Sequence, residues 1–208
     1  MPPLNADRAV LIAAREVLLR DPRATMAAVA EEAGMGVAGL YRRYANKESL
    51  LRAVAADNYR RHIAFAEAAL TDTADPWHAF TTFLRNVLDD GLPRLTLALR
   101  GEVTFDQALH DLDRLATDTT NRLLRGARGS GILRPDVTRA DITVLLEQIG
   151  RMEVGDDVRS AGLRRRYLTL VCDGLRAEAA GGRLPGPPPR EAELARRWTA
   201  AASDVTAS

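Results

Sequence analysis

The sequence predicts an all-α protein. Its 208 residues are rich in Ala, Leu and Arg, which are strong helix formers. Apolar residues recur at helical spacing in one segment after another, and no segment alternates as a strand does. Because 46 % of the residues are hydrophobic and 27 % are charged, as in ordinary globular proteins, we expect one or two packed domains.

Charge and cysteine content narrow the functional class. The formal net charge is only +1, so any affinity for nucleic acid must come from locally placed residues. A single cysteine, Cys172, excludes an intrachain disulfide and fits a reducing compartment. The sequence shows neither a secretory signal nor an apolar run of the roughly 20 residues that span a membrane. We therefore expect a soluble, cytoplasmic protein.

Residues 1–6 are expected to form a loose arm. Asn5 or Asp7 can cap the first predicted helix, which runs to about Arg20. Asp21-Pro22 stops this helix, because the residue before a proline avoids the helical region. Apolar residues at helical spacing mark its buried face: Val10, Ala14, Val17 and Leu18.

Residues 25–47 read as two helices joined by a glycine turn. Thr25 is a typical N-cap, and Gly34 suits a left-handed residue after the helix end. The next helix is expected from Val37 to Ala45, with Val37, Leu40 and Tyr44 inward. Asn46 then caps a helix to about Leu70. Such a helix-turn-helix places its second helix in the DNA major groove.

Chemistry at this unit suits DNA. Small residues at the start of the second helix permit close approach, and polar side chains beside it suit phosphates. Lys47 lies at a helix N-terminus, where free N–H groups also attract anions. The phosphate candidates are Tyr41, Arg42, Arg43 and Lys47, and either arginine suits a guanine edge. The same spacing also occurs in helical pairs that never touch DNA, with the arginines forming a solvated face.

The rest of the chain predicts further helices. Asp75-Pro76 and Thr138–Asp141 read as helix starts, and Gly91, Pro93 and Gly155 read as breaks. The expected helices cover about 76–90, 92–99, 103–128, 138–150 and 160–179. A Gly/Pro-rich tail from residue 181 should be mostly disordered, apart from a short surface helix at 191–198.

No catalytic or metal-binding pattern stands out in the body. His62, His78 and His110 are too far apart in sequence to suggest a metal site, and Cys172 reads as a small buried hydrophobe. We expect no cofactor and no enzymatic activity.

Residues 8–54 resemble the DNA-binding domain of the TetR family of transcriptional regulators. The resemblance rests on a set of motifs at the family's spacing: Leu11-Ile12-Ala13-Ala14, Thr25, Ala30-Glu31-Glu32-Ala33-Gly34, Leu40-Tyr41-Arg42-Arg43-Tyr44 and Lys47-Glu48-Ser49-Leu50. Tyr44 replaces the family's usual Phe, and Asp21-Pro22 replaces a glycine. The resemblance implies that Thr25, Tyr41 and Lys47 hold phosphates. It also implies that the stretch from Gly36 through Val37 and Ala38 to Arg42 faces the groove.

The resemblance also implies how the body works. A TetR-like protein has a DNA-binding domain, here 1–50, and a helical domain for an effector and dimerisation, here 51–180, with 181–208 as the tail. Its last two long helices, about 138–152 and 160–178, would pair with those of a twin. The stretch from Asp75-Pro76-Trp77 to Arg176 resembles a recurrent TetR C-terminal subfamily.

These implications predict a homodimeric repressor released from an operator by an unknown small molecule. Aromatic and aliphatic residues of the body are the candidate effector liners, and any one of them also reads as plain core: Phe65, Phe80, Phe83, Leu84, Leu99, Phe105, Leu109 and Met152. Glu102, Thr104 and Arg151 are candidate polar contacts. Two alternatives stay open. One is an effector-binding or adaptor protein that has lost DNA binding, and the other is a small helical enzyme.

Overall fold

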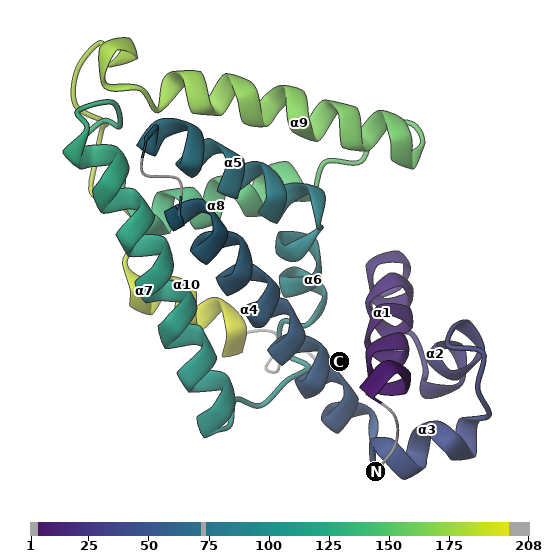
Figure 1. The fold of residues 1–208 in the computed structure, drawn as a ribbon. Coiled ribbons are helices and arrows are strands. Elements are labelled where there is room, and N and C mark those ends of the chain that lie inside the picture. Colours follow the sequence, from purple (N-terminus) through teal and green to yellow (C-terminus); the bar gives the residue numbers. More distant parts are fainter. Residues whose placement is uncertain (1–3, 72–73, 200–208) are drawn as a thin grey trace, which may run out of the picture.

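The computed structural model describes residues 4–71 and 74–199, and the all-α prediction is confirmed (Figure 1). Within these ranges the regular elements are helices, with one isolated bridge between Leu133 and Arg176. No helix in the described part is both long and apolar enough to cross a membrane. The helices are α1 (Leu4–Arg20), α2 (Met26–Glu32), α3 (Val37–Arg43), α4 (Lys47–Thr71), α5 (Pro76–Asp89), α6 (Leu92–Ala98), α7 (Gln107–Gly129), α8 (Arg139–Gly150), α9 (Asp157–Gly174), η1 (Ala177–Ala179) and α10 (Glu191–Thr199).

Helices α1, α2 and α3 form a small head at one end of the molecule (Figure 1). Val10 and Ala14 of α1 pack with Val29 of α2 and with Leu40 of α3, whose side chain is completely buried. A core of this size is stable only when more apolar surface is added to it. Leu50 from the start of α4 supplies part of that surface.

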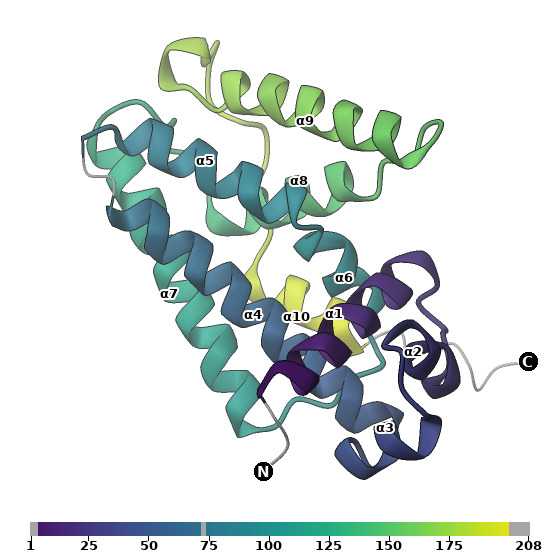
Figure 2. The ribbon, with the colours of Figure 1, turned by 45° about the vertical axis from the view of Figure 1, so that its right-hand side comes forward.

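Helix α4 connects the head with the body, as both views show (Figures 1 and 2). Leu50, Leu51 and Val54, near its N-terminus, belong to the hydrophobic core of the head. Ala66 and Ala69, near its C-terminus, belong to the core of the body. The predicted domain boundary at residue 50 thus falls inside a 25-residue helix that belongs to both parts.

The body packs α5 against α4, α7 and α9 (Figure 1). Phe80, Phe83 and Leu84 of α5 lie at its centre, each at most 1 % exposed. Helix α5 starts where the sequence indicated, since the Asp75 carboxylate accepts a hydrogen bond from His78 N at 2.9 Å and Pro76 occupies the first turn. The predicted capping box of α8 is also present, with Thr138 and Asp141 bonding each other's backbone N–H groups.

Several helix limits differ from the prediction. Helix α1 already begins at Leu4, although residues 1–6 were expected to be a loose arm; residues 1–3 lie outside the described residues. Helix α7 begins at Gln107 rather than 103, because Asp106 caps it and Gly101 has a left-handed φ of 77°. Helix α9 begins at Asp157, where Asp156 is the cap, and ends at Gly174 rather than near 179. Capping hydrogen bonds, which periodicity does not reveal, set the starts of α7 and α9.

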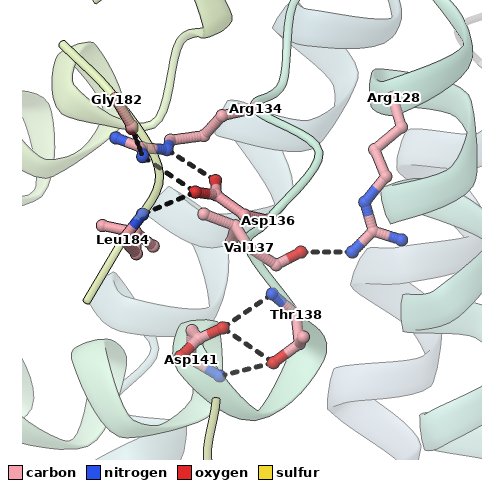
Figure 3. A network of polar contacts seen from close by, with 8 residues as sticks. All are labelled: Arg128, Arg134, Asp136, Val137, Thr138, Asp141, Gly182 and Leu184. Carbon is pink, nitrogen blue, oxygen red and sulfur yellow. Dashed lines mark hydrogen bonds and ion pairs between the residues drawn. The ribbon is translucent and has the colours of Figure 1, made fainter. Parts of the chain in front are cut away.

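The tail was expected to be mostly disordered, but residues 181–199 make defined contacts. Arg134 donates to the carbonyl oxygen of Gly182 at 2.8 Å, and Leu184 N donates to Asp136 Oδ2 at 2.8 Å (Figure 3). The expected short helix is present as α10. Residues 200–208, the rest of the predicted disordered tail, lie outside the described residues.

Candidate nucleic-acid interface and body cavity

The turn between α2 and α3 is set by two local features. The Thr25 side chain accepts a hydrogen bond from Ala28 N at 3.3 Å, so the predicted N-cap of α2 is confirmed. Gly34 has a φ of 64°, a conformation that costs little only for glycine. Together with the extended N-cap Gly36, Gly34 forms the short turn that leads from α2 into α3.

Helix α3 presents one face to the outside. Leu40 is its buried residue, whereas Tyr41 is 48 % exposed and Arg42 is also exposed. Gly36 and Ala38 are exposed as well, so no bulky side chain covers the front of the helix. Val37 was expected to face inward, but it is 41 % exposed. A seven-residue helix has only two turns, and Leu40 alone suffices to anchor it to the core.

Arg43 does not join the exposed face. Its Nε donates to Asp7 Oδ1 of α1 at 3.0 Å, and its side chain is only 22 % exposed. The sequence grouped Arg43 with Arg42, but adjacent helical residues point about 100° apart. In the structure Arg42 faces outward while Arg43 links α3 to α1.

Lys47 lies beside the start of α2. Its Nζ donates to the carbonyl oxygen of Arg23 at 3.4 Å, two residues before the Thr25 cap. The ammonium group and the exposed Thr25 hydroxyl therefore come together from two helix N-termini, although they are 22 residues apart in sequence. An ammonium group beside free helical N–H groups suits a phosphate oxygen.

The body contains a cavity of about 940 Å³. That size is typical of sites for small organic molecules. Its walls come from α4 to α8, from the loop 101–105 and from α10. The lining includes Lys47, Asn58, Tyr59, His62, Phe83, Phe105, Asp113, Thr120, Arg139, Thr143, Glu147, Glu191, Leu194 and Ala195.

Only part of the predicted effector set lines this cavity. Phe83 and Phe105 do so, as do the suggested polar residues Glu102 and Thr104. Arg151 is exposed and lies outside the cavity lining. The remaining apolar candidates pack in the cores or lie elsewhere, and none of them lines the cavity: Phe65, Phe80, Leu84, Leu99, Leu109 and Met152. Helical periodicity marks the inward faces of a helix, but it does not separate packed core from cavity wall.

The polar residues of α4 that line the cavity were not predicted from the sequence. Asn58, Tyr59 and His62 lie on α4, where polar residues interrupt an inward face. The Asn58 amide donates to Thr96 Oγ1 at 3.0 Å, and the Tyr59 hydroxyl donates to Asp113 Oδ1 at 3.0 Å. Burial and the nearby Asp113 carboxylate raise the pKa of Tyr59, so its hydroxyl stays protonated. Polar residues on an otherwise apolar helical stripe were the signal available in the sequence.

His62 is neutral and has a defined tautomer. Burial, together with the positive charge of Arg139, lowers the pKa of His62 to about 4. Its Nε2 lies 2.9 Å from Thr120 Oγ1, whose own proton is donated to the carbonyl oxygen of Ala116 at 2.8 Å. Nε2 must therefore carry the proton and donate it to Thr120, which leaves Nδ1 as an acceptor.

Neither metal chemistry nor thiol chemistry is indicated in the part of the chain that the structure describes. Its His, Cys, Asp and Glu side chains form no group of three that would hold a metal ion. Cys172 is buried in the body core, and burial with the neighbouring Asp173 raises the pKa of its thiol to about 11. Cys172 thus has the environment of the small buried hydrophobe that the sequence indicated.

Comparisons with protein families match both parts of the chain. Residues 10–54 match the family described as bacterial regulatory proteins of the TetR family. Residues 75–177 match a family of C-terminal domains described as transcriptional regulator SbtR-like. No curated protein matches the chain.

Solved structures share the fold over most of the chain. A TetR regulatory protein from Mycobacterium vanbaalenii is 27 % identical, with a TM-score of 0.59, and the match covers 84 % of this chain and 100 % of that one. A TetR regulator from Streptomyces coelicolor is 24 % identical, with a TM-score of 0.63 and coverage of 82 % and 98 %. LfrR from Mycobacterium smegmatis, solved in complex with proflavine, is 21 % identical, with a TM-score of 0.63 and coverage of 86 % and 99 %.

The two family matches agree with the helix-turn-helix head and the helical body that the structure shows. TetR proteins are regulators of transcription and not enzymes. The chain therefore belongs to the TetR family and is a DNA-binding transcriptional regulator.

Proposed function

We propose that the protein is a homodimeric repressor that leaves its operator when a small molecule occupies the body cavity. The observation that carries this proposal is the double role of α4. Lys47, in its first turn, lies beside Thr25 at the exposed face of the head. Asn58 and His62, farther along the same helix, line the cavity.

The cavity reaches the head. Besides Asn58 and His62, its lining includes Lys47 and Leu51, and Leu51 also belongs to the head core. The 15 residues from Lys47 to His62 span about 22 Å of rigid helix. A ligand that moves the wall formed by α4 must therefore move Lys47 with it. It changes operator affinity only if it binds one position of α4 better than the other.

Helix α9 supports dimerisation with a second copy. Leu168, Cys172 and Leu175 lie on its buried side. Its other side carries a stripe at i, i+4, i+7 and i+11 that consists of Leu163, Tyr167, Leu170 and Gly174. Within this stripe Tyr167 is 43 % exposed and Leu170 is 55 % exposed. Helix α9 also lies at the outer edge of the body (Figure 1). An apolar helical stripe on an outer helix is typical of an interface.

A dimer formed through α8 and α9 would present two copies of α3. Two such helices read half-sites one helical turn of DNA apart, about 34–36 Å, or a multiple of it. Near-neutral overall charge means that the head residues must supply the affinity. We assign phosphate contacts to Thr25, Tyr41 and Lys47, and the groove-facing surface to the exposed residues from Gly36 to Arg42.

Operator binding by fluorescence anisotropy tests this proposal. The DNA is the region upstream of the protein's own gene, titrated at several salt concentrations. Tyr41→Ala and Lys47→Ala should both weaken binding to all sequences, and Lys47→Ala should also lower the salt slope by about one, because it removes a charge that neutralises a phosphate. Wild-type affinity and slope in both variants would refute the assigned contacts.

The alternative, an effector-binding protein without DNA affinity, has no structural support in the head. The exposed Thr25, Tyr41 and Arg42 and the placement of Lys47 keep the features that binding requires. A gel shift with the same upstream DNA separates the two functions, because an adaptor protein would give no retarded band.

A further inference from the structure

Helix α10 forms one side of the body cavity. Glu191, Leu194 and Ala195 stand among the lining residues, together with walls from α4, α7 and α8. Figures 1 and 2 show α10 in yellow close to α4 and α7. The matched C-terminal domain ends at residue 177, so α10 lies outside it.

The chain is held firmly just before α10. Arg134 is 8 % exposed and binds Asp136 through Nε at 2.8 Å and the Gly182 carbonyl oxygen through Nη2 at 2.8 Å (Figure 3). Asp136 in turn accepts from Leu184 N. The Arg134 guanidinium, with the Leu184 N–H, holds the pKa of Asp136 well below its usual range, so this anchor keeps its charges at physiological pH.

Helix α10 meets the cavity through side chains that are themselves exposed or half-buried. Within the described residues, both hydrophobic cores are built from other elements, and Leu194 is only half-buried. Glu191 forms an ion pair with Arg139 of α8, but the Glu191 side chain is 63 % exposed. Exposed ion pairs hold weakly because water screens them. A hydrogen-bonded anchor, a Pro/Gly segment at residues 185–189 and a helix with exposed and half-buried side chains follow one another along the chain.

We propose that α10 is a lid on the effector cavity. The lid moves about a hinge within residues 185–190 and so admits the ligand. Within this segment Gly186, with a φ of 73°, is the point of movement, and Pro187 to Pro189 form a stiff arm. The anchor at Gly182 and Leu184 keeps the open lid close to its seat. The lid closes by placing Leu194 and Ala195 against the cavity and Glu191 on Arg139. The inference rests on the proposed function only in calling the admitted molecule an effector.

Thiol labelling measures the closure without any effector or DNA. Thr143 lines the cavity from α8, and Thr143→Cys in a Cys172→Ser background places a reactive thiol there. Ellman's reagent is then added to the full chain and to a chain that ends at Gly186, which keeps the anchor and lacks α10. Asp118→Cys, at an exposed position of α7, is the control thiol.

The lid predicts that the Thr143→Cys thiol, at a partly buried position of the cavity wall, reacts several-fold faster in the shortened chain, because α10 no longer covers the cavity. The Asp118→Cys thiol should react at one rate in both chains. Equal rates for the Thr143→Cys thiol in the two chains would overturn the proposal.

A second variant keeps the test decisive if the shortened chain folds poorly. Glu191→Gln lies on the exposed surface and removes only the ion pair with Arg139. It should speed labelling of the Thr143→Cys thiol by up to about fivefold, the effect of one exposed ion pair. Asp111→Asn, which removes the Arg114–Asp111 pair on α7, is the matched control and should change nothing. An unchanged rate in Glu191→Gln contradicts the lid, whereas loss of operator binding would concern only the proposed function.

Discussion

Arg43 of α3 donates its Nε to the Asp7 carboxylate of α1 at 3.0 Å, which turns this arginine away from the exposed face of the head. Its neighbour Arg42 points outward. The two adjacent arginines are therefore placed differently: Arg43 links α3 to α1, and Arg42 is exposed on the face that we propose contacts DNA.

Replacing each arginine separates these roles. Arg42→Ala should lower the salt slope of operator binding by about one if Arg42 contacts a phosphate, while Arg43→Ala should leave the slope unchanged. Arg43→Ala should instead lower the free energy of unfolding by at most about 1 kcal/mol, because the pair is partly exposed. Asp7→Asn is the matched control for stability. An equal loss of slope in both arginine variants would contradict the assignment.

Thr25 has two roles that substitutions can distinguish. Thr25→Ala removes the cap of α2 and should cost about 1 kcal/mol in the free energy of unfolding. Thr25→Asp keeps a capping oxygen, so its thermal midpoint should stay near that of the wild type, but its carboxylate repels a phosphate.

Operator affinity of Thr25→Asp should therefore fall although the head is intact, whereas Thr25→Ser should keep both properties. Melting curves and anisotropy titrations measure the two effects. Wild-type operator affinity in Thr25→Asp would show that no phosphate lies beside this residue.

His62 should make stability depend on pH. Its pKa is lowered to about 4 in the folded chain, whereas an unfolded histidine titrates near about 6.5. Between these values the unfolded chain binds the extra proton, so the free energy of unfolding falls as pH falls. The contribution of His62 is fully present above about pH 6.5 and amounts to on the order of 3 kcal/mol.

Denaturant unfolding of His62→Gln between pH 7.5 and 4.5 checks this prediction. The variant should lose less stability across this range than the wild type. His78→Gln, at an exposed position, is the control and should follow the wild type. Parallel pH curves for His62→Gln and the wild type would mean that His62 is not held neutral.

The apolar stripe of α9 gives a prediction about assembly. Leu170→Arg places a charge on the exposed stripe and should convert the proposed dimer to a monomer in light scattering at micromolar concentration. Leu115→Arg makes the same change at a residue of α7 that is 46 % exposed and should leave the assembly intact. A dimer that persists in Leu170→Arg would exclude this face as the interface.

Local chemistry explains which features the sequence predicted well. Thr25, Gly34, Asn46, Asp75 and Thr138 act within a few residues of the chain, and each cap or turn lies where it was predicted. The exposed position of Tyr41 and Arg42 follows from the same short helix.

Contacts between distant segments account for what the sequence did not show. The ion pair of Arg43 joins residues 36 positions apart, and the hydrogen bond of His62 joins residues 58 positions apart. Periodicity alone cannot indicate such partners. For the same reason Phe80 and Leu84 were grouped with Phe83, although only Phe83 reaches the cavity.

Lys47 stands where α4 begins, at the proposed DNA interface, and the reactivity of its amine tests this placement most directly. Lys47 is the only lysine in the chain. An amine-acetylating reagent therefore modifies only Lys47 and the N-terminal amine, and peptide mass spectrometry measures each rate separately. Saturating upstream DNA should slow acetylation of Lys47 at least several-fold, as expected for an ammonium group held on a phosphate, while unrelated DNA at high salt should not. Acetylation of Lys47 at the same rate in the DNA complex and in the free protein would show that α4 does not begin at the DNA interface.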